Sequence, residues 1–137
     1  MNQPEPAPLR PLAETLIGVL GIEMLEQSPE RMVGRMPIDN RTIQPAGIVH
    51  AGALASLADT LASIGTMLGL DPRTQFCVGQ ELSISLLRPV AEGKSVDGEA
   101  VLLHRGRTSA VWDVRMRTPE GKLAAISRCT VAIRARE

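Results

Sequence analysis

The stretch QPAGIVHAGALASLADTLASIGTMLGL, residues 44–70, decides the fold of this 137-residue chain. It is the longest apolar run in the sequence, and Gly69 and Pro72 near its end are residues that terminate helices. Large apolar side chains recur in it every three or four residues, which places them on one face of a helix. The run therefore predicts a long central helix from about His50 to Leu70. The apolar positions are Leu54, Leu57, Leu61, Ile64 and Leu68.

The predicted helix contains one carboxylate. Asp59 is the single charged residue between Ala51 and Leu70, and it lies in the middle of the apolar run. Burying an unpaired carboxylate is costly or shifts its pKa, so we expect either that neighbouring hydroxyls hold this acid or that the protein uses it in chemistry. One face of the helix then belongs in a core, and the other faces a site or a subunit interface. The polar residues predicted to share one stripe are Ser56, Asp59, Thr60, Ser63 and Thr66.

The chain on either side of the helix has the patterns of short strands. Before it, a short amphipathic helix is predicted over Pro11–Ile17, ended by Gly18 and Gly21, and two short strands within residues 22–38. After Pro72, apolar and polar side chains alternate with a period of two.

Three long consecutive strands joined by tight turns predict an antiparallel meander with one apolar face. Only the central helix is apolar enough to cover that face. The sequence therefore predicts an α+β fold in which an antiparallel sheet of five to six strands wraps around one long helix.

Composition excludes two classes of partner. Fifteen basic and fifteen acidic residues give a formal net charge of zero, so there is no positive footprint for nucleic acid and no polybasic run for a membrane. One Trp, one Phe and no Tyr leave almost nothing for bases to stack on. The central helix is near the length of a membrane span, but the acid at its centre favours a helix covered by protein. We expect neither nucleic acid nor membrane as a partner.

The cysteines and the N-terminus complete this description. Cys77 and Cys129 are too few for a disulfide framework and lack metal-ligand spacing, so both are expected to be reduced thiols of a cytoplasmic protein without a metal site. Residues 1–8 alternate proline with polar residues and predict a mobile tail. The remainder, residues 9–137, is long enough for one domain with a single core.

The start of the helix has the features of an oxyanion site. His50 lies at or beside the N-cap, between Gly47 and Gly52, which would leave the backbone N–H groups of Ala51 and Gly52 free. A helix N-terminus attracts the negative charge that develops on a carbonyl oxygen during acyl transfer. The alternative is local: His50 only caps the helix, and the glycines relieve crowding.

His50 and Asp59 cannot act together within one helix. They are nine residues apart, and so they lie on opposite faces, separated by about 13 Å along the axis. If both are catalytic, two chains must supply them. A two-fold dimer with paired helices is the simplest arrangement.

These residues resemble a known family. QPAGIVHAGALASLAD is similar to the signature of the hotdog-fold acyl-CoA thioesterases, in particular the PaaI-like and 4-hydroxybenzoyl-CoA thioesterase group. ELSISLLRPV and LLHRGRTSAVWDV resemble that family's strand after the helix and its His-x-Gly-Arg segment, so the match covers most of residues 35–135. Two positions differ. Ala51 replaces the first Gly of His-Gly-Gly, and Asp59, usual in PaaI-like members, stands where the branch with the enterobactin-pathway proofreading thioesterase usually has Glu.

The resemblance implies a hotdog fold that hydrolyses an acyl-CoA thioester with an aroyl or medium-chain acyl group. In one subunit, the N–H of Ala51 or Gly52 and the side chains of Gln44 and His50 would hold and polarise the thioester carbonyl. These roles belong to the family's motif and are carried over position by position.

The acid of the reaction would come from the second subunit. Asp59 would attack as a nucleophile or activate water as a general base, and Ser63 would orient the water or the acid. No cofactor is implied, because coenzyme A enters as part of the substrate. The assembly implied is a homodimer or a tetramer of two dimers.

Coenzyme A carries phosphates, whose binding requires cations at the mouth of the pocket. Arg88, Arg105 and Arg107 are the candidates, with Gly106 permitting close backbone approach. The ordinary alternative is that these strand-end arginines are solvated and that His104 is structural. An acyl carrier protein could also deliver the thioester in place of free coenzyme A.

Two other functions remain open at this point. A hotdog domain can bind or sense acyl-CoA without catalysis, but a sensing domain usually accompanies an output domain, and Asp59 argues against an inactive site. A hotdog hydratase or dehydratase would carry a motif such as His-Phe-Pro, which this chain lacks. Release of thiol, as opposed to hydration of an enoyl thioester, distinguishes the latter class from a thioesterase.

Overall fold

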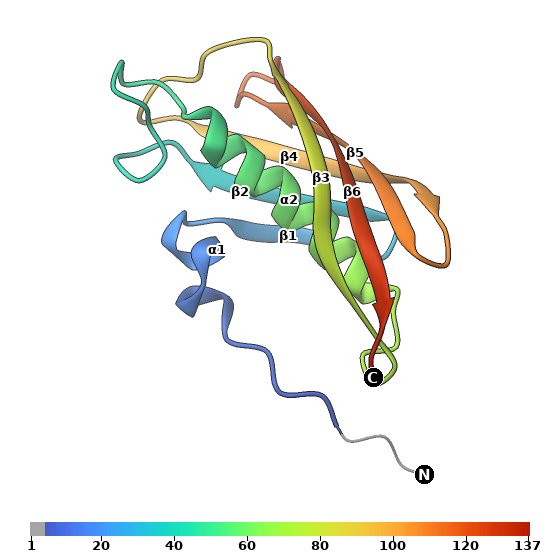
Figure 1. Cartoon of the computed structure of the whole chain (residues 1–137). Helices are drawn as coiled ribbons and strands as arrows, with labels where there is room; N and C mark the ends of the chain where they lie inside the picture. The colour runs from blue at the N-terminus through green and yellow to red at the C-terminus, as the bar shows by residue number, and fades with distance from the viewer. Residues whose placement is uncertain (1–4) are drawn as a thin grey trace.

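The computed structural model describes residues 5–137 and shows a six-stranded antiparallel sheet curled around one long helix (Figure 1). This confirms the predicted α+β architecture. The strands lie in the order β1-β2-β4-β5-β6-β3, and each neighbouring pair is antiparallel. The elements are α1 (Leu16–Val19), α2 (Ala51–Leu68), β1 (Glu23–Gln27), β2 (Arg31–Pro37), β3 (Gln75–Leu86), β4 (Ser95–Arg105), β5 (Ser109–Arg117) and β6 (Leu123–Ala135).

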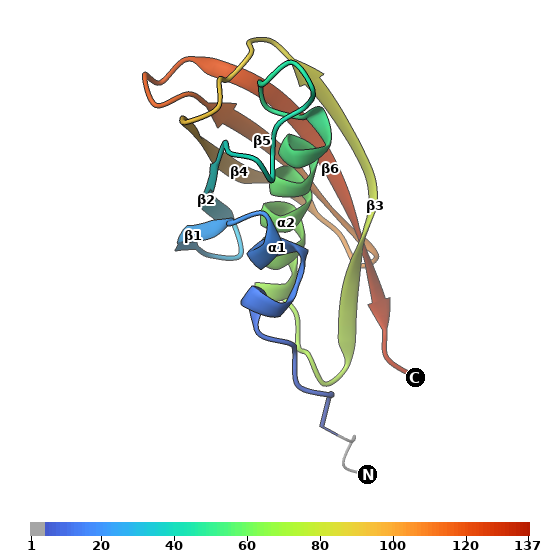
Figure 2. The same cartoon turned by 90° about the vertical axis from the view of Figure 1, so that its left-hand side faces the viewer.

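The central helix α2 crosses the concave face of the sheet, and the second view shows the strands curving around it (Figures 1 and 2). The predicted meander is confirmed for β4, β5 and β6. The strand after α2 does not continue it, because β3 pairs with β6 on the far side and becomes the edge opposite β1. By length and composition Ala51–Leu68 is apolar enough to cross a membrane, yet half of it is buried inside this fold.

The apolar face of α2 lies unusually close to the sheet. Leu54, Leu57 and Leu61 are fully buried. Opposite them, Gly34 on β2 and Gly98 on β4 are register partners, and a Cβ on either glycine would crowd the side chains of Leu57 and Leu61. The missing side chains therefore give the two leucines room to pack against the strand backbones.

A buried polar link ties the last turns of α2 to β5. Trp112 is fully buried, and its indole Nε1–H donates to Thr66 Oγ1 at 2.9 Å, while the Thr66 hydroxyl donates to Ala62 O at 2.8 Å. The prediction that Thr66 lies on the polar stripe of the helix was wrong. Its hydroxyl is buried because it is the partner that the indole N–H needs inside the core.

The N-terminal region differs from the prediction of one helix over Pro11–Ile17. A 3₁₀ turn at Leu12–Glu14 is followed by the short α1, because Thr15 between them has an extended backbone. Gly18 therefore lies inside α1, whereas Gly21, with φ +72°, makes the turn into β1. Of the predicted tail, residues 1–4 lie outside the described residues, and residues 5–11 form neither helix nor strand.

The edge strand β3 leaves several large apolar side chains exposed. The segment around residues 82–86 was predicted to turn an apolar face to the core, but only Ile84 is partly buried there. The reason is that β3 is the last strand of the sheet, with β6 on one side and no strand of residues 5–137 on the other. The exposed side chains are Phe76, Val78, Leu82 and Leu86.

We expect the Thr66→Val substitution to lower the free energy of unfolding by about 1–3 kcal/mol, because it leaves the buried indole N–H without an acceptor. Trp112 is the only tryptophan of the chain, so its fluorescence reports on this site during urea denaturation. Thr66→Ser keeps the hydroxyl and is the matched control, which should retain the native emission spectrum. An unchanged emission spectrum and stability in Thr66→Val would contradict the assigned role.

Candidate active site

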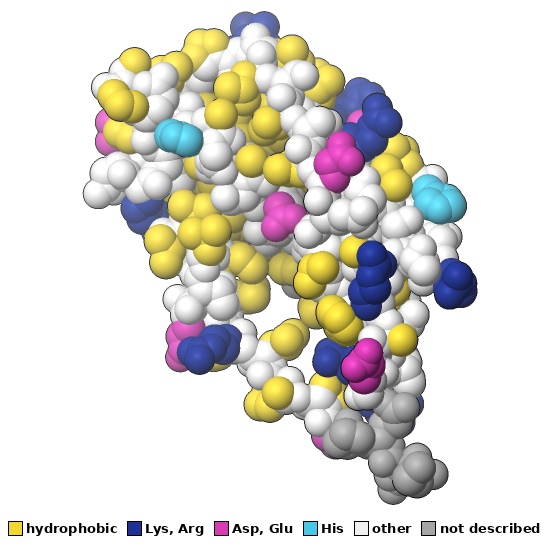
Figure 3. Space-filling view, in the orientation of Figure 1, with side chains coloured by type: hydrophobic (Ala, Val, Ile, Leu, Met, Phe, Trp, Pro, Cys, Tyr) yellow, Lys and Arg dark blue, Asp and Glu magenta, His cyan; other side chains and the backbone are white. Residues whose placement is uncertain are grey.

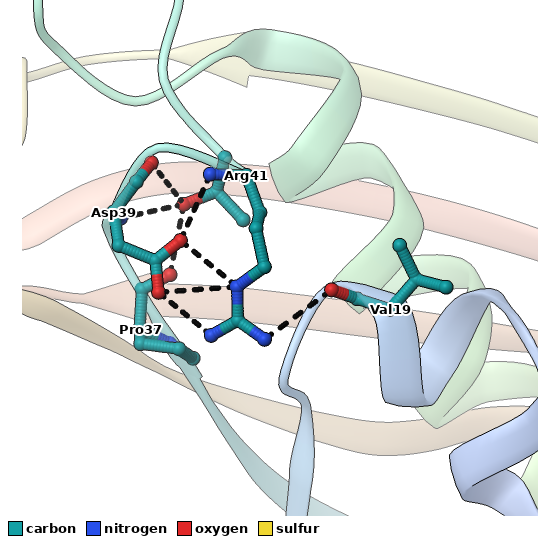
Figure 4. Close-up of polar contacts among 5 residues, drawn as sticks. Val19, Pro37, Asp39 and Arg41 are labelled. Atoms are coloured by element: carbon teal, nitrogen blue, oxygen red, sulfur yellow. Dashed lines mark hydrogen bonds and ion pairs between the residues drawn. The ribbon is translucent and has the colours of Figure 1, made fainter.

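The loop before α2 is held by a buried threonine. The Thr42 hydroxyl donates to Pro37 O at 2.9 Å and accepts the Asp39 N–H at 3.0 Å, which closes a tight turn at the end of β2 (Figure 4). The carbonyl of the same Thr42 accepts the His50 N–H at 2.8 Å. A single buried residue thus fixes both the turn and the first residue of the helix cap.

An ion pair closes the same turn from outside. The Arg41 guanidinium contacts the Asp39 carboxylate at 2.6 Å and donates to Val19 O at 3.3 Å, so it links the loop to α1 (Figure 4). The Arg41 hydrogen bonds to this carboxylate, from its side chain and from its backbone, hold the pKa of Asp39 below its ordinary value. Neither residue was predicted from the sequence to have a role at the site, because an Asp and an Arg two positions apart are common in solvated turns.

His50 is the N-cap of α2, as predicted, but its ring uses one of the two N–H groups expected to be free. Its Nδ1 accepts the Gly52 N–H at 2.7 Å. An Nδ1 that accepts a hydrogen bond carries no proton, so the neutral ring bears its proton on Nε2 and can donate it. Within residues 5–137 the Ala51 N–H has no hydrogen-bond partner. The donors at this helix start are therefore the Ala51 N–H and His50 Nε2–H, not the Gly52 N–H.

Gln44 lies in the same loop, and its side chain has a fixed orientation. Its Oε1 accepts the Ala46 N–H, and its backbone carbonyl accepts the Gly47 N–H at 2.9 Å. With the amide oxygen engaged, the NH₂ group of Gln44 is the part that can donate to a ligand. A hollow of about 210 Å³ next to His50 is lined by side chains of α1, this loop and the first turns of α2.

Asp59 is exposed in the single chain, which excludes the alternative of a buried acid held in the core. Its Oδ1 lies 3.4 Å from the Ser63 hydroxyl, one turn further along α2. Its carboxylate rests over Gly79 of β3, where a Cβ would overlap it, and the strand register shifts by one residue between Gly79 and Glu81. The structure therefore brings Ser63 to Asp59, as predicted, and adds Gly79, which sequence analysis missed. A glycine inside a strand pattern signals such close approach.

The neighbouring thiol is not a competing nucleophile. Cys77 is half-buried, and its Sγ contacts Ser63 O at 3.6 Å. Burial raises the pKa of this thiol, so it is protonated at neutral pH, and a neutral thiol is a poor nucleophile. On this side of α2, Asp59 is the group suited to act as base or nucleophile.

Asp59 and the helix start remain apart in one chain. Both belong to the continuous helix α2, so the predicted separation of about 13 Å along its axis applies. Viewed from the helix side, apolar side chains gather over the area around α2 and β3 (Figure 3).

The predicted coenzyme A residues lie at opposite ends of α2. Arg105 caps its C-terminus: its guanidinium donates to Thr66 O at 3.3 Å, to Gly65 O at 3.4 Å and to Pro29 O at 3.2 Å. These contacts give Arg105 a structural position, favourable because helix C-termini attract cations. Of the predicted coenzyme A residues, Arg105 is therefore the least suited to bind phosphate.

The other residues of the set are more open. Gly106 forms the β4–β5 turn through its N–H to Ser109 O at 2.8 Å, and Arg107 beside it is exposed, as is His104. Arg88 is exposed after β3, near the helix start, and donates to Leu123 O at 3.3 Å. Among the described residues no group of three or more His, Cys, Asp or Glu is placed to hold a metal ion.

Comparison with known proteins decides the family. Residues 46–125 match the model of the Thioesterase superfamily. The chain belongs to this superfamily. The proofreading thioesterase EntH of Cronobacter turicensis is 40% identical to this thioesterase over 121 residues, which cover 87% of this chain and 85% of that protein.

Solved structures of thioesterases have the same fold as this chain. The crystal structure of a mutant of thioesterase PA1618 from Pseudomonas aeruginosa has a TM-score of 0.87 at 34% identity, covering 91% of this chain and 89% of that one. A hypothetical thioesterase of Streptococcus pneumoniae TIGR4, solved with coenzyme A, has a TM-score of 0.78 at 23% identity, covering 88% and 92%, which shows a shared fold alone. The predicted hotdog thioesterase fold is confirmed, and the protein is a thioester hydrolase, in preference to the sensing and hydratase alternatives.

The Asp39–Arg41 pair gives a pH dependence of stability. The pKa of Asp39 is lower in the folded state than its unfolded value of about 3.9. Its stabilising effect is thus complete well above pH 4 and is lost as the pH falls through the folded pKa. Asp39→Asn should therefore unfold at lower urea concentration than the wild type at pH 7, and the difference should shrink as the pH is lowered below 4. Arg41→Gln should show the same loss. A difference that is constant across the series would contradict this assignment.

Proposed function

We propose that this thioesterase hydrolyses acyl-CoA thioesters at a site shared by two copies of the chain. The observation that carries the proposal is the arrangement on α2, where a set of donors at the helix start and an exposed acid at mid-helix lie too far apart to act on one carbonyl. Two helices placed side by side and antiparallel would bring the donors of one next to the acid of the other.

The donors at the helix start would bind the thioester carbonyl oxygen. The Ala51 N–H, His50 Nε2–H and the Gln44 amide would act together at the first turn of α2, where the helix dipole favours negative charge. As the carbonyl carbon becomes tetrahedral, its oxygen gains charge, and donors already fixed by the Thr42 turn stabilise it without reorganising.

Asp59 would carry out the chemical step. As a general base its carboxylate takes a proton from water, the resulting hydroxide forms a C–O bond to the carbonyl carbon, and the C–S bond breaks to release the thiolate, which then takes up a proton. As a nucleophile the carboxylate itself attacks the carbonyl carbon, the C–S bond breaks to release the thiolate, which takes up a proton, and water then hydrolyses the resulting anhydride to the free acid and the Asp59 carboxylate. The Ser63 hydroxyl, 3.4 Å from Oδ1, would orient either the acid or the water.

The edge strand β3 is the surface that would join the two copies. It is 12 residues long, unpaired on its outer side within the described chain, and carries the exposed Phe76, Val78, Leu82 and Leu86. A long apolar edge strand is a template for pairing with another strand. Antiparallel pairing of two β3 edges would extend the sheet and set the two α2 helices beside each other. Two such dimers would then form the tetramer implied by the resemblance.

Coenzyme A as the thiol carrier is supported by the pneumococcal fold neighbour solved with coenzyme A and by the exposed Arg88 near the helix start. Arg107, with Gly106, is the second candidate contact for phosphate, at the other end of α2. We also propose that the protein is cytoplasmic and that its substrate carries an aroyl or medium-chain acyl group. An acyl carrier protein is the alternative thiol carrier.

Removal of the acid tests the proposal directly. Asp59→Asn should lower kcat about 100-fold or more on every thioester that the wild type hydrolyses, because the amide can neither take a proton nor attack. Thiol release is followed with a thiol-reactive dye on benzoyl-, phenylacetyl-, hexanoyl- and decanoyl-CoA. Near-normal turnover by a folded Asp59→Asn protein would exclude Asp59 from the reaction.

Mixing two variants separates a shared site from a site within one chain. Asp59→Asn and His50→Ala, unfolded and refolded together, form mixed dimers in which one of two sites has both native residues. A shared site should therefore recover activity to about a quarter of the wild-type level. Each variant refolded alone is the control, and no recovery in the mixture would contradict the shared site.

Gly79 should be needed to position the acid. Gly79→Ala places a methyl group against the Asp59 carboxylate and should lower kcat by roughly tenfold to a hundredfold with little change in KM, because a displacement of about 1 Å is enough for such a loss. Alanine is otherwise tolerated in strands. Gln80→Ala, at the next and exposed position, is the control. Wild-type kcat in folded Gly79→Ala would show that the close contact has no role in catalysis.

A further inference from the structure

We infer that the far end of the acyl chain binds in a hollow at the C-terminal end of α2, underneath the N-terminal segment, and that the preferred substrates are therefore medium-chain aliphatic thioesters. This inference rests on the proposed function, since it takes the thioester carbonyl to lie at Asp59.

One stripe of α2 runs from the acid toward this hollow. Asp59, Ser63 and Met67 follow each other at four-residue spacing and so lie on one stripe of α2. The facing residues of β3 alternate along the strand in the opposite direction: Gly79 lies under Asp59, and the Cys77 Sγ contacts the carbonyl of Ser63. The seam between α2 and β3 therefore runs from the carboxylate toward the helix C-terminus.

The seam ends in a hollow of about 170 Å³. An apolar cavity of about 150 Å³ holds one benzene molecule, so this volume takes a group of about six carbons. The N-terminal segment closes one side of it, and the space-filling view shows an open gap between that segment and the body of the molecule (Figure 3). The apolar lining residues include Pro6, Leu9, Met67, Leu70, Phe76 and Cys77.

The length of the path selects the acyl group. From Asp59 to Met67 there are eight residues, which span about 12 Å of helix axis. With C–C bonds of about 1.5 Å, an extended alkyl chain needs roughly eight to ten carbons to cover this distance. A benzoyl group ends well before the hollow, whereas a decanoyl chain places its last carbons inside it.

The chemistry of the hollow favours a hydrocarbon over the pantetheine arm of coenzyme A. Its side chains from α2 and from the N-terminal segment are apolar, while the amides of pantetheine require polar partners. Two polar residues contribute, Gln75 and Arg136; Arg136 donates through Nε to Pro72 O at 2.6 Å, and its guanidinium carbon lies 5.6 Å from the centre of the Phe76 ring.

The experiment compares hexanoyl-CoA and decanoyl-CoA in the wild type, in Met67→Trp and in Leu70→Trp, which fill the hollow from two sides. Each buried methylene adds roughly fourfold to binding, so the wild type should prefer decanoyl-CoA in kcat/KM by tenfold or more. Both variants should lose this preference and keep hexanoyl-CoA hydrolysis within about twofold of the wild type. Leu68→Trp, on the adjacent exposed position outside the hollow, is the matched control and should keep the preference.

Two outcomes would overturn the inference while leaving the proposed function intact. One is a wild type that hydrolyses both esters without a preference for the longer chain. The other is an equal rise in KM for both esters in Met67→Trp and Leu70→Trp, which would place the coenzyme A arm in the hollow. Calorimetric affinity of the two esters for Asp59→Asn gives the same comparison without turnover. If the wild type hydrolyses no acyl-CoA, the proposed function fails first, and this inference fails with it.

Discussion

The rest of the structure depends on the close packing of one helix against the sheet. Leu57 and Leu61 reach the strand backbones only because Gly34 and Gly98 have no side chains beneath them. This contact fixes the height and rotation of α2, and the same rotation turns Asp59 outward, over Gly79 at the sheet edge. One rigid element thus builds the core with one face and presents the chemistry with the other. Because it is rigid, it cannot fold its own acid back toward its own N-terminus, and the proposed reaction therefore requires a second copy.

Sequence periodicity was sufficient to predict the helices and strands that are amphipathic. The spacing of Leu54, Leu57 and Leu61 predicted α2 to within two residues at its end, and the alternation of side chains predicted the strands of the meander. The cap by His50 was predictable because it requires only local chemistry. The pairing of strands that are distant in the sequence was not predictable in this way. The sequence of β3 does not state that its neighbour is β6, since either edge of the meander offers the same hydrogen bonds.

The same limit applies to side chains with long-range partners. Thr66 was assigned to the polar stripe because its spacing fits, and it is buried because Trp112, 46 residues away, requires an acceptor. Arg105 was assigned to phosphate because it follows a family motif, and its guanidinium instead meets the carbonyls at the end of α2. Gly79 was overlooked: a glycine inside a strand signals a close approach, but the sequence does not say that the approaching group is the Asp59 carboxylate. Each of these residues is explained by a neighbour that only the fold supplies.

The helix start shows why one glycine of the family's His-Gly-Gly motif can be replaced and the other cannot. A Cβ at Gly52 would lie 2.9 Å from His50 Nδ1 and 3.0 Å from Cε1, so a side chain there would displace the ring that caps the helix. Position 51 has no such constraint, because the His50 ring bonds to the N–H of Gly52 and leaves the Ala51 N–H without a partner. Alanine there keeps the donor and favours the helical backbone. In the proposed site its methyl group would narrow the space next to the reacting carbonyl, and an unbranched acyl chain that runs along the seam between α2 and β3 would be the shape least affected by this narrowing.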